Sequence, residues 1–157
     1  MQLGEHEQAR RLDQDTLTRY RRVLGEDHPD TLTSANNLAG DLRRLGEHEQ
    51  TRQLDRDTLT RYRRVLGEDH PDTLYSASNL AGDLRQLGEH EQARQLDRDT
   101  LTRRRRVLGQ DHPDTLTSAN NLASDLRQLG EQDAAAALEE DVARRRRHGP
   151  EPADHSS

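Results

Sequence analysis

Hydrophobic residues recur along the chain at helical spacing. In residues 30–45 the apolar positions lie three or four residues apart, as on one face of an amphipathic helix: Leu32, Ala35, Leu38, Ala39, Leu42 and Leu45. Residues 5–24 carry a second such stripe: Ala9, Leu12, Thr16, Tyr20 and Val23, widened by Leu17 and Leu24. Pro29 suits a first helical turn, where its missing N–H costs nothing, and Gly25 and Gly46 suit helix ends. The pattern predicts two consecutive helices.

Both helical patterns repeat every 42 residues. Blocks 4–45, 46–87 and 88–129 match one another at 36 of 42 positions in each pairwise comparison, and a partial block follows from 130 to about 148. The connections at GEH and GEDHP are short, so consecutive helices must fold back as antiparallel neighbours. The sequence therefore predicts an all-α row of helical hairpins.

The repeat predicts five segments. Residues 1–25 form an orphan second helix of a truncated repeat, because residues 1–4 align with 85–88, the end of a first helix. Repeats follow at 26–67, 68–109 and 110–148, the last with a C-terminal capping helix that has lost the apolar residues needed to receive another helix. Residues 149–157 are polar and contain proline, so we expect them to be disordered.

The opening helix keeps the apolar pattern of the interior helices, although the outward face of a terminal repeat should be polar. We therefore expect something to cover it. The chain is either a fragment of a longer protein or a protomer that self-associates end to end through its uncovered N-terminal helix.

Composition narrows the class of protein. Charged residues make up 34% of the chain, which alone would indicate disorder, but stacked repeats can assemble a continuous core from sparse leucines. A net charge of −6 argues against a general nucleic-acid or membrane-surface binder. Cysteine is absent, which excludes disulfides and thiolate zinc sites and favours the cytoplasm. No apolar run resembles a signal peptide or a membrane span.

The 42-residue period, together with the LG, HP, NNLA and G-x-x-x-x-A motifs, resembles the tetratricopeptide repeat (TPR) of the kinesin light chain type over residues 1 to about 147. The resemblance implies a right-handed solenoid of antiparallel helical hairpins that binds proteins and is not an enzyme. Similar arrays are frequent in bacteria with GC-rich genomes, often in signalling or enzymatic proteins. Asp and Thr stand where this family usually has an aromatic residue and Ala, so we expect loose packing and marginal stability: Asp13, Asp55, Asp97, Thr16, Thr58 and Thr100.

The resemblance also implies that the first helices line a concave, peptide-binding face. Their polar stripes are Thr33, Asn36, Asn37, Gly40 and Arg43, then Tyr75, Ser78, Asn79, Gly82 and Arg85, then Thr117, Asn120, Asn121, Ser124 and Arg127. Asparagine amides both donate and accept, which suits the main chain of an extended peptide, and arginines favour carboxylates, which suggests an acidic one. Tyr75 is the strongest single candidate contact.

Plainer interpretations of this stripe stay open. The asparagines Asn37, Asn79 and Asn121 would then only join helices by hydrogen bonds, and the arginines would be solvated. Tyr75 would be a half-buried helix residue without a special role.

Six histidines recur in register: His6, His48, His90, His28, His70 and His112. Equivalent residues of successive hairpins lie roughly 16 to 20 Å apart, too far to share a metal ion, and the His-Pro pairs more plausibly cap helices. The sequence therefore predicts no metal site and no cofactor.

The arginine runs suggest nucleic acid, but ordinary ion pairs explain them better. Asp15, Asp57 and Asp99 lie four residues before Arg19, Arg61 and Arg103, and no aromatic stacking platform accompanies the charge. A Ser-His-Asp set can be drawn from Ser34, His28 and Asp30 but would be copied in every repeat, unlike an active site. We expect neither nucleic-acid binding nor catalysis.

Overall fold

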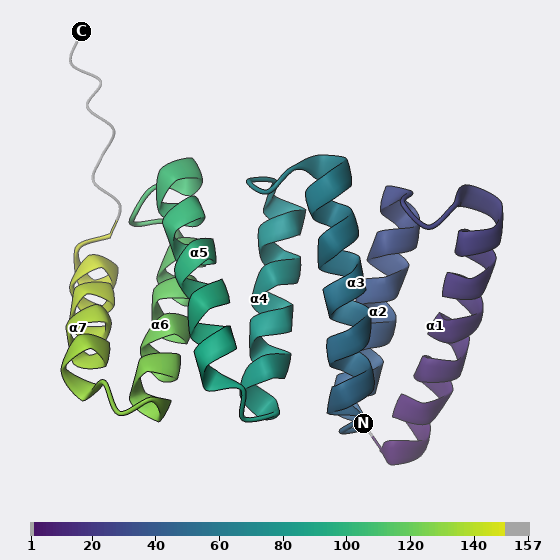
Figure 1. Ribbon diagram of the computed structural model, residues 1–157, viewed down its shortest axis with the longest axis horizontal. Coiled ribbons are helices and arrows are strands. Elements are labelled where there is room, and N and C mark those ends of the chain that lie inside the picture. Colours follow the sequence, from purple (N-terminus) through teal and green to yellow (C-terminus); the bar gives the residue numbers. More distant parts are fainter. Residues whose placement is uncertain (1, 150–157) are drawn as a thin grey trace, which may run out of the picture. The chain divides into compact units, whose positions relative to one another are not determined.

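The computed structural model describes residues 2–149, which contain seven α-helices (Figure 1). They are α1 Leu3–Leu24, α2 Pro29–Arg44, α3 His48–Leu66, α4 Pro71–Gln86, α5 His90–Leu108, α6 Pro113–Gln128 and α7 Gln132–His148. The helices pack as sequential hairpins, which confirms the predicted fold class. From residue 150 on, the tail expected to be disordered lies outside the described residues.

The chain forms two compact units, Met1–Glu89 with α1 to α4 and His90–Ser157 with α5 to α7. In the first unit α1 packs on α2, α2 on α3 and α3 on α4 (Figure 1). In the second unit α5 packs on α6 and α6 on α7. The division falls between α4 and α5, inside the repeat expected at 68–109, and the proposed repeat boundaries stay a prediction.

Local signals set the helix ends, as expected from the sequence. His28 precedes α2 in an extended conformation, and its Nδ1 accepts a hydrogen bond from the backbone N–H of Asp30 at 3.1 Å. His70 and His112 cap α4 and α6 in the same way. Pro29 opens α2, and Gly46 follows the end of this helix at a φ of 76°, a conformation that suits glycine. The predicted His-Pro caps are confirmed.

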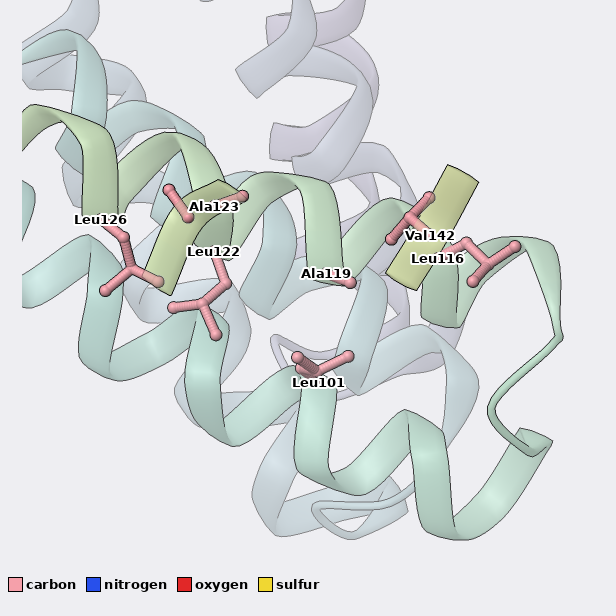
Figure 2. Close-up of a cluster of buried hydrophobic side chains, with 8 residues drawn as sticks. Leu101, Leu116, Ala119, Leu122, Ala123, Leu126 and Val142 are labelled. Atoms are coloured by element: carbon pink, nitrogen blue, oxygen red, sulfur yellow. The ribbon is translucent and has the colours of Figure 1, made fainter. Parts of the chain in front are cut away.

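The core of each unit is built from leucine and alanine. In the first unit Leu17, Ala35, Leu38 and Leu42 are buried together, and the partly buried Leu54 packs against them. The second unit buries a cluster formed by Leu101, Leu116, Ala119, Leu122, Ala123, Leu126, Ala135 and Val142 (Figure 2). No helix within residues 2–149 is both long and apolar enough to cross a membrane.

Candidate functional site

A cavity of about 270 Å³ opens on α2 and α4 of the first unit. Five of the predicted groove residues line it: Asn36, Asn37, Arg43, Tyr75 and Asn79. Gly40 also lines the cavity, together with three charged residues that the groove prediction did not include: Asp13, Asp41 and Arg44. The structure thus brings residues from two consecutive first helices around one space.

Two asparagines and one tyrosine offer free polar groups to this cavity. Among residues 2–149, nothing hydrogen-bonds to the side-chain amides of Asn37 and Asn79, so these amides do not join the helices. Asn36 differs, because its Nδ2 donates to the Tyr62 hydroxyl at 3.4 Å. The Tyr75 side chain is 57% exposed, and it is the only aromatic side chain among the described residues that line the cavity.

Arg43 is held by the protein itself. Its Nε donates to Asp83 Oδ1 at 3.0 Å and its Nη2 donates to Asp55 Oδ2 at 2.8 Å. Both aspartate side chains are fully buried, whereas the arginine side chain is 35% exposed. The guanidinium therefore joins α2 to α3 and α4 and is not an uncommitted cation for a ligand.

The Asp55–Asp83 pair places two carboxyl groups side by side in the interior. Burial is the largest effect on Asp55, and the hydrogen bond and charge of Asp83 add to it, while Arg43 opposes them, so the pKa of Asp55 is raised to about 8. Asp55 Oδ1 and Asp83 Oδ2 receive no hydrogen bond from any other residue within 2–149. We infer that the pair holds one proton at neutral pH.

Asp13 and Asp41 form the equivalent pair one repeat earlier. The pKa of Asp13 is raised to about 6, first by burial and then by the hydrogen bond and charge of Asp41. Arg44, from the same helix as Asp41, donates to Asp41 Oδ1 at 3.0 Å. No guanidinium bridges this pair within the described residues, in contrast to Arg43 on the Asp55–Asp83 pair.

The remaining groove candidates of the first unit are less accessible or locally bonded. Thr33 is exposed and donates from Oγ1 to the Pro29 carbonyl at 3.1 Å. Ser78 and Arg85 are half-buried.

The second unit carries the third stripe on α6. Asn120 and Asn121 are half-buried, and Thr117 is exposed with its hydroxyl bonded to the Pro113 carbonyl. Arg127 Nε donates to Glu139 Oε1 at 2.8 Å, so this arginine is also held by a carboxylate of its own unit.

Two polar groups in the interior were not predicted from the sequence. The first is the pair of buried aspartates that holds Arg43, for which the sequence does carry a signal: Asp83 interrupts the apolar stripe between Leu80 and Leu84. The second is Arg104, which stands where the preceding repeat has Tyr62. It is only 7% exposed, and its Nη1 donates to Ser118 Oγ at 2.7 Å.

Other sequence candidates have structural roles. Two of the three expected intrahelical ion pairs are present, Arg61 with Asp57 and Arg103 with Asp99, each at 3.0 Å. No group of three or more histidine or acidic side chains within residues 2–149 could hold a metal ion.

The family profile described as Tetratricopeptide repeat matches residues 1–50, 30–105 and 75–148. The chain belongs to the tetratricopeptide repeat family. Repeats of this family are generally protein-binding modules and typically form non-catalytic scaffolds.

Solved structures agree with this TPR fold. A putative kinesin light chain from Podosopora anserina with nearly identical TPR-like repeats is 23% identical, with a TM-score of 0.85 over 98% of this chain and 72% of that one. A point variant of that protein has a TM-score of 0.83 and 23% identity, over 92% of this chain and 68% of that one. BtubC (BKLC) from P. vanneervenii is 20% identical, with a TM-score of 0.84 over 98% of this chain and 63% of that one.

The three solved structures support the TPR fold and the similarity of these repeats to those of kinesin light chains. They carry no information about the ligands of this chain. No curated protein matches the chain.

Proposed function

We propose that the chain binds an extended peptide segment of a partner protein in the cavity on α2 and α4. The observation that carries the proposal is the meeting of Asn37, Asn79 and the exposed Tyr75 around one space of about 270 Å³. Each amide offers a donor and an acceptor to a peptide main chain, and the tyrosine ring offers apolar contact area with a polar end.

Recognition in this proposal relies on main-chain and aromatic contacts more than on charge. Arg43 is bound to Asp55 and Asp83, and the cavity carries Asp13 and Asp41 beside Arg43 and Arg44. Two acidic and two basic side chains give the lining little net charge. The preference for an acidic peptide, expected from the arginine stripe, therefore becomes the weaker part of the proposal.

A peptide selected from a random library against the full chain provides the test. Its affinity is then measured by calorimetry with the wild-type chain and with Asn37→Ala, Asn79→Ala and Tyr75→Ala variants. We expect Tyr75→Ala to weaken binding at least about tenfold, because aromatic anchors dominate such contacts, and each asparagine variant to weaken it less.

Val107→Ala is the control, because Val107 is also an exposed large hydrophobic residue but lies on α5 of the second unit and does not line this cavity. Equal losses for Val107→Ala and Tyr75→Ala, or no loss for either, would contradict the groove proposal.

A second candidate function is assembly, either with another copy or within a longer signalling or enzymatic protein. It is favoured by α1, which carries five of the eight large hydrophobic side chains that are exposed within residues 2–149. Concentration-dependent molar mass in sedimentation would support self-association.

The proposal describes a binding scaffold without catalytic activity of its own. It includes a cytoplasmic location, based on the absence of cysteine, and a bacterial source, based on the type of repeat array.

A further inference from the structure

The outer face of α1 exposes two side chains whose equivalents on α3 are covered. Leu12 and Tyr20 are 61% and 39% exposed. On α3 the residue equivalent to Tyr20 is Tyr62, which is only 2% exposed, and Leu54, equivalent to Leu12, packs against the core. An exposed apolar face of this kind marks an interaction surface.

Helix α2 shows what covers such a face. Asn36 donates to the hydroxyl of Tyr62, and Arg43, two helical turns later on the same side, donates to both Asp55 and Asp83. Between these polar residues, Leu38 and Leu42 contribute to the core against which Leu54 packs. Helix α2 thus meets α3 through leucines, an asparagine and an arginine, and the same arginine also reaches α4.

The surface on α1 and α2 carries the same hydrogen-bond acceptors that α3 and α4 present to α2. Tyr20, Asp13 and Asp41 stand where α3 and α4 have Tyr62, Asp55 and Asp83. Asp41 is 4% exposed, and apart from Asp13 no residue within 2–149 forms a hydrogen bond with its Oδ2. Residue 1, the sequence equivalent of Arg43, is a methionine and cannot supply a guanidinium.

Arg44 replaces this missing guanidinium only in part. The later repeats have Gln86 and Gln128 at this position, so the arginine is specific to the first pair. It reaches Asp41 Oδ1 from the same helix, with a side chain that is 58% exposed, and it leaves Asp13 without a hydrogen-bonded cation. Asp13 also lines a second cavity, of about 210 Å³, together with Tyr20.

We propose that the outer face of α1, with the Asp13–Asp41 pair at its edge, binds an amphipathic helix of a partner protein that carries an arginine. The arginine enters between Asp13 and Asp41, as Arg43 does between Asp55 and Asp83. An asparagine two turns earlier donates to the Tyr20 hydroxyl, and apolar residues cover Leu12. Asp13 and Asp41 also line the cavity of the proposed peptide groove, whereas Leu12 and Tyr20 do not.

Charge favours this occupant over other helices. A guanidinium bound by two carboxylates forms charge-assisted hydrogen bonds that a neutral or acidic side chain cannot form. The groups that face Asp13 are Asp41 and Arg44 of α2, and they raise and lower its pKa respectively around a value of about 6. Because a guanidinium prefers the ionised carboxyl, partner affinity should fall as the pH is lowered through this value.

The test uses the full chain and a capped synthetic peptide with the sequence of residues 28–45, which contains α2. Binding is measured by calorimetry for this peptide and for two single variants, Arg43→Gln and Arg44→Gln, which have the same net charge. We expect the Arg43→Gln peptide to bind at least about tenfold more weakly, and the Arg44→Gln peptide to bind within about twofold of the parent.

Two protein variants locate the contact. Asp13→Asn should weaken binding of the parent peptide about tenfold and abolish the difference between the parent and Arg43→Gln peptides, as a direct pair requires. Tyr75→Ala should weaken binding of this peptide much less than Asp13→Asn does, which distinguishes the outer face of α1 from the peptide groove. A peptide that displaced α2 from its own position would be weakened by Asp55→Asn, because its Arg43 would then contact Asp55 and Asp83.

Equal binding of the Arg43→Gln and Arg44→Gln peptides, or binding insensitive to Asp13→Asn, overturns the proposal. Self-association of the chain without peptide binding also overturns it and assigns the face to a second copy. If no peptide binds at millimolar concentration, the same peptides are joined ahead of Met1 by a flexible linker to raise their effective concentration. A urea midpoint that then depends on Arg43 and on Asp13 supports the site, and one that depends on neither overturns it.

Discussion

Helices α1 and α3 have nearly the same sequence and different surroundings. Over 22 aligned positions, residues 3–24 and 45–66 differ at only three: Ala9 and Thr51, Arg11 and Gln53, Gln14 and Arg56. Yet Tyr62 is 2% exposed and Tyr20 is 39% exposed. The cause is α2, which packs on α3 and contacts Tyr62, whereas no helix of the first unit packs on the equivalent face of α1. The same residues are core in one copy and surface in the other.

The buried carboxylates show the same contrast. Asp55 is fully buried and bound by Arg43, and its pKa is raised to about 8, whereas Asp13 is only partly buried and its pKa is raised to about 6. Burial by a neighbouring helix thus changes the chemistry of a repeated residue. Variants at equivalent positions of the two repeats can measure how much this burial contributes to stability.

The largest difference is expected between the two tyrosines. Tyr62→Ala should lower the free energy of unfolding by about 3 kcal/mol, because it removes a buried ring and leaves a cavity. Tyr20→Ala should cost less than about 1 kcal/mol, since its ring is already in contact with water. Urea unfolding followed by circular dichroism gives both values, and similar losses for the two variants would show that α1 is covered in solution.

Arginine removal should have the next largest effect. Arg43→Gln should destabilise the chain by about 2 kcal/mol, less than for many buried pairs, because the Asp55–Asp83 pair can retain its proton. Arg44→Gln, which restores the residue of the later repeats, should cost less than about 1 kcal/mol, since this side chain is mostly exposed. Urea unfolding of both variants checks the expectation, and a larger loss for Arg44→Gln would contradict it.

A pH effect should distinguish the two carboxylate pairs. A carboxyl whose pKa is raised on folding binds its proton more tightly in the folded state, so its contribution is complete below the unfolded pKa and is lost as pH rises. For Asp55 the loss extends to about pH 8, and for Asp13 it ends near pH 6. Asp55→Asn should therefore remove the decline in thermal midpoint between neutral pH and about pH 8, whereas Asp13→Asn should not. Thermal melts of both variants across this pH range test the prediction. An unchanged decline in Asp55→Asn would show that Asp55 does not cause it.

The smallest effect is expected on the outer face of α1. Leu12→Ser should change the free energy of unfolding by less than about 0.5 kcal/mol, because the side chain is mostly exposed. The control is Leu17→Ala on the same helix, which is 1% exposed and should cost about 2 to 3 kcal/mol. A large loss for Leu12→Ser in urea unfolding would mean that this leucine is buried in solution.

Most of the helical architecture could be predicted from the chain alone. Leucine and alanine at spacings of three and four identified the helices, and the His-Pro pairs identified the starts of α2, α4 and α6. These signals are local, because a helix brings together residues within four positions and its caps act within two or three. The 42-residue period then implied hairpins, and five predicted groove residues do line one cavity.

The partners of the polar side chains were decided only by tertiary packing. Arg43 was expected to face a ligand, but it contacts Asp55 and Asp83, which lie 12 and 40 residues further along the chain. Likewise, nothing in residues 3–24 distinguishes the exposed Tyr20 from the buried Tyr62. Periodicity shows which residues share a helix face. Burial, pKa and ion pairing depend on the helix that packs against that face, and the sequence of a single helix does not determine which helix that is.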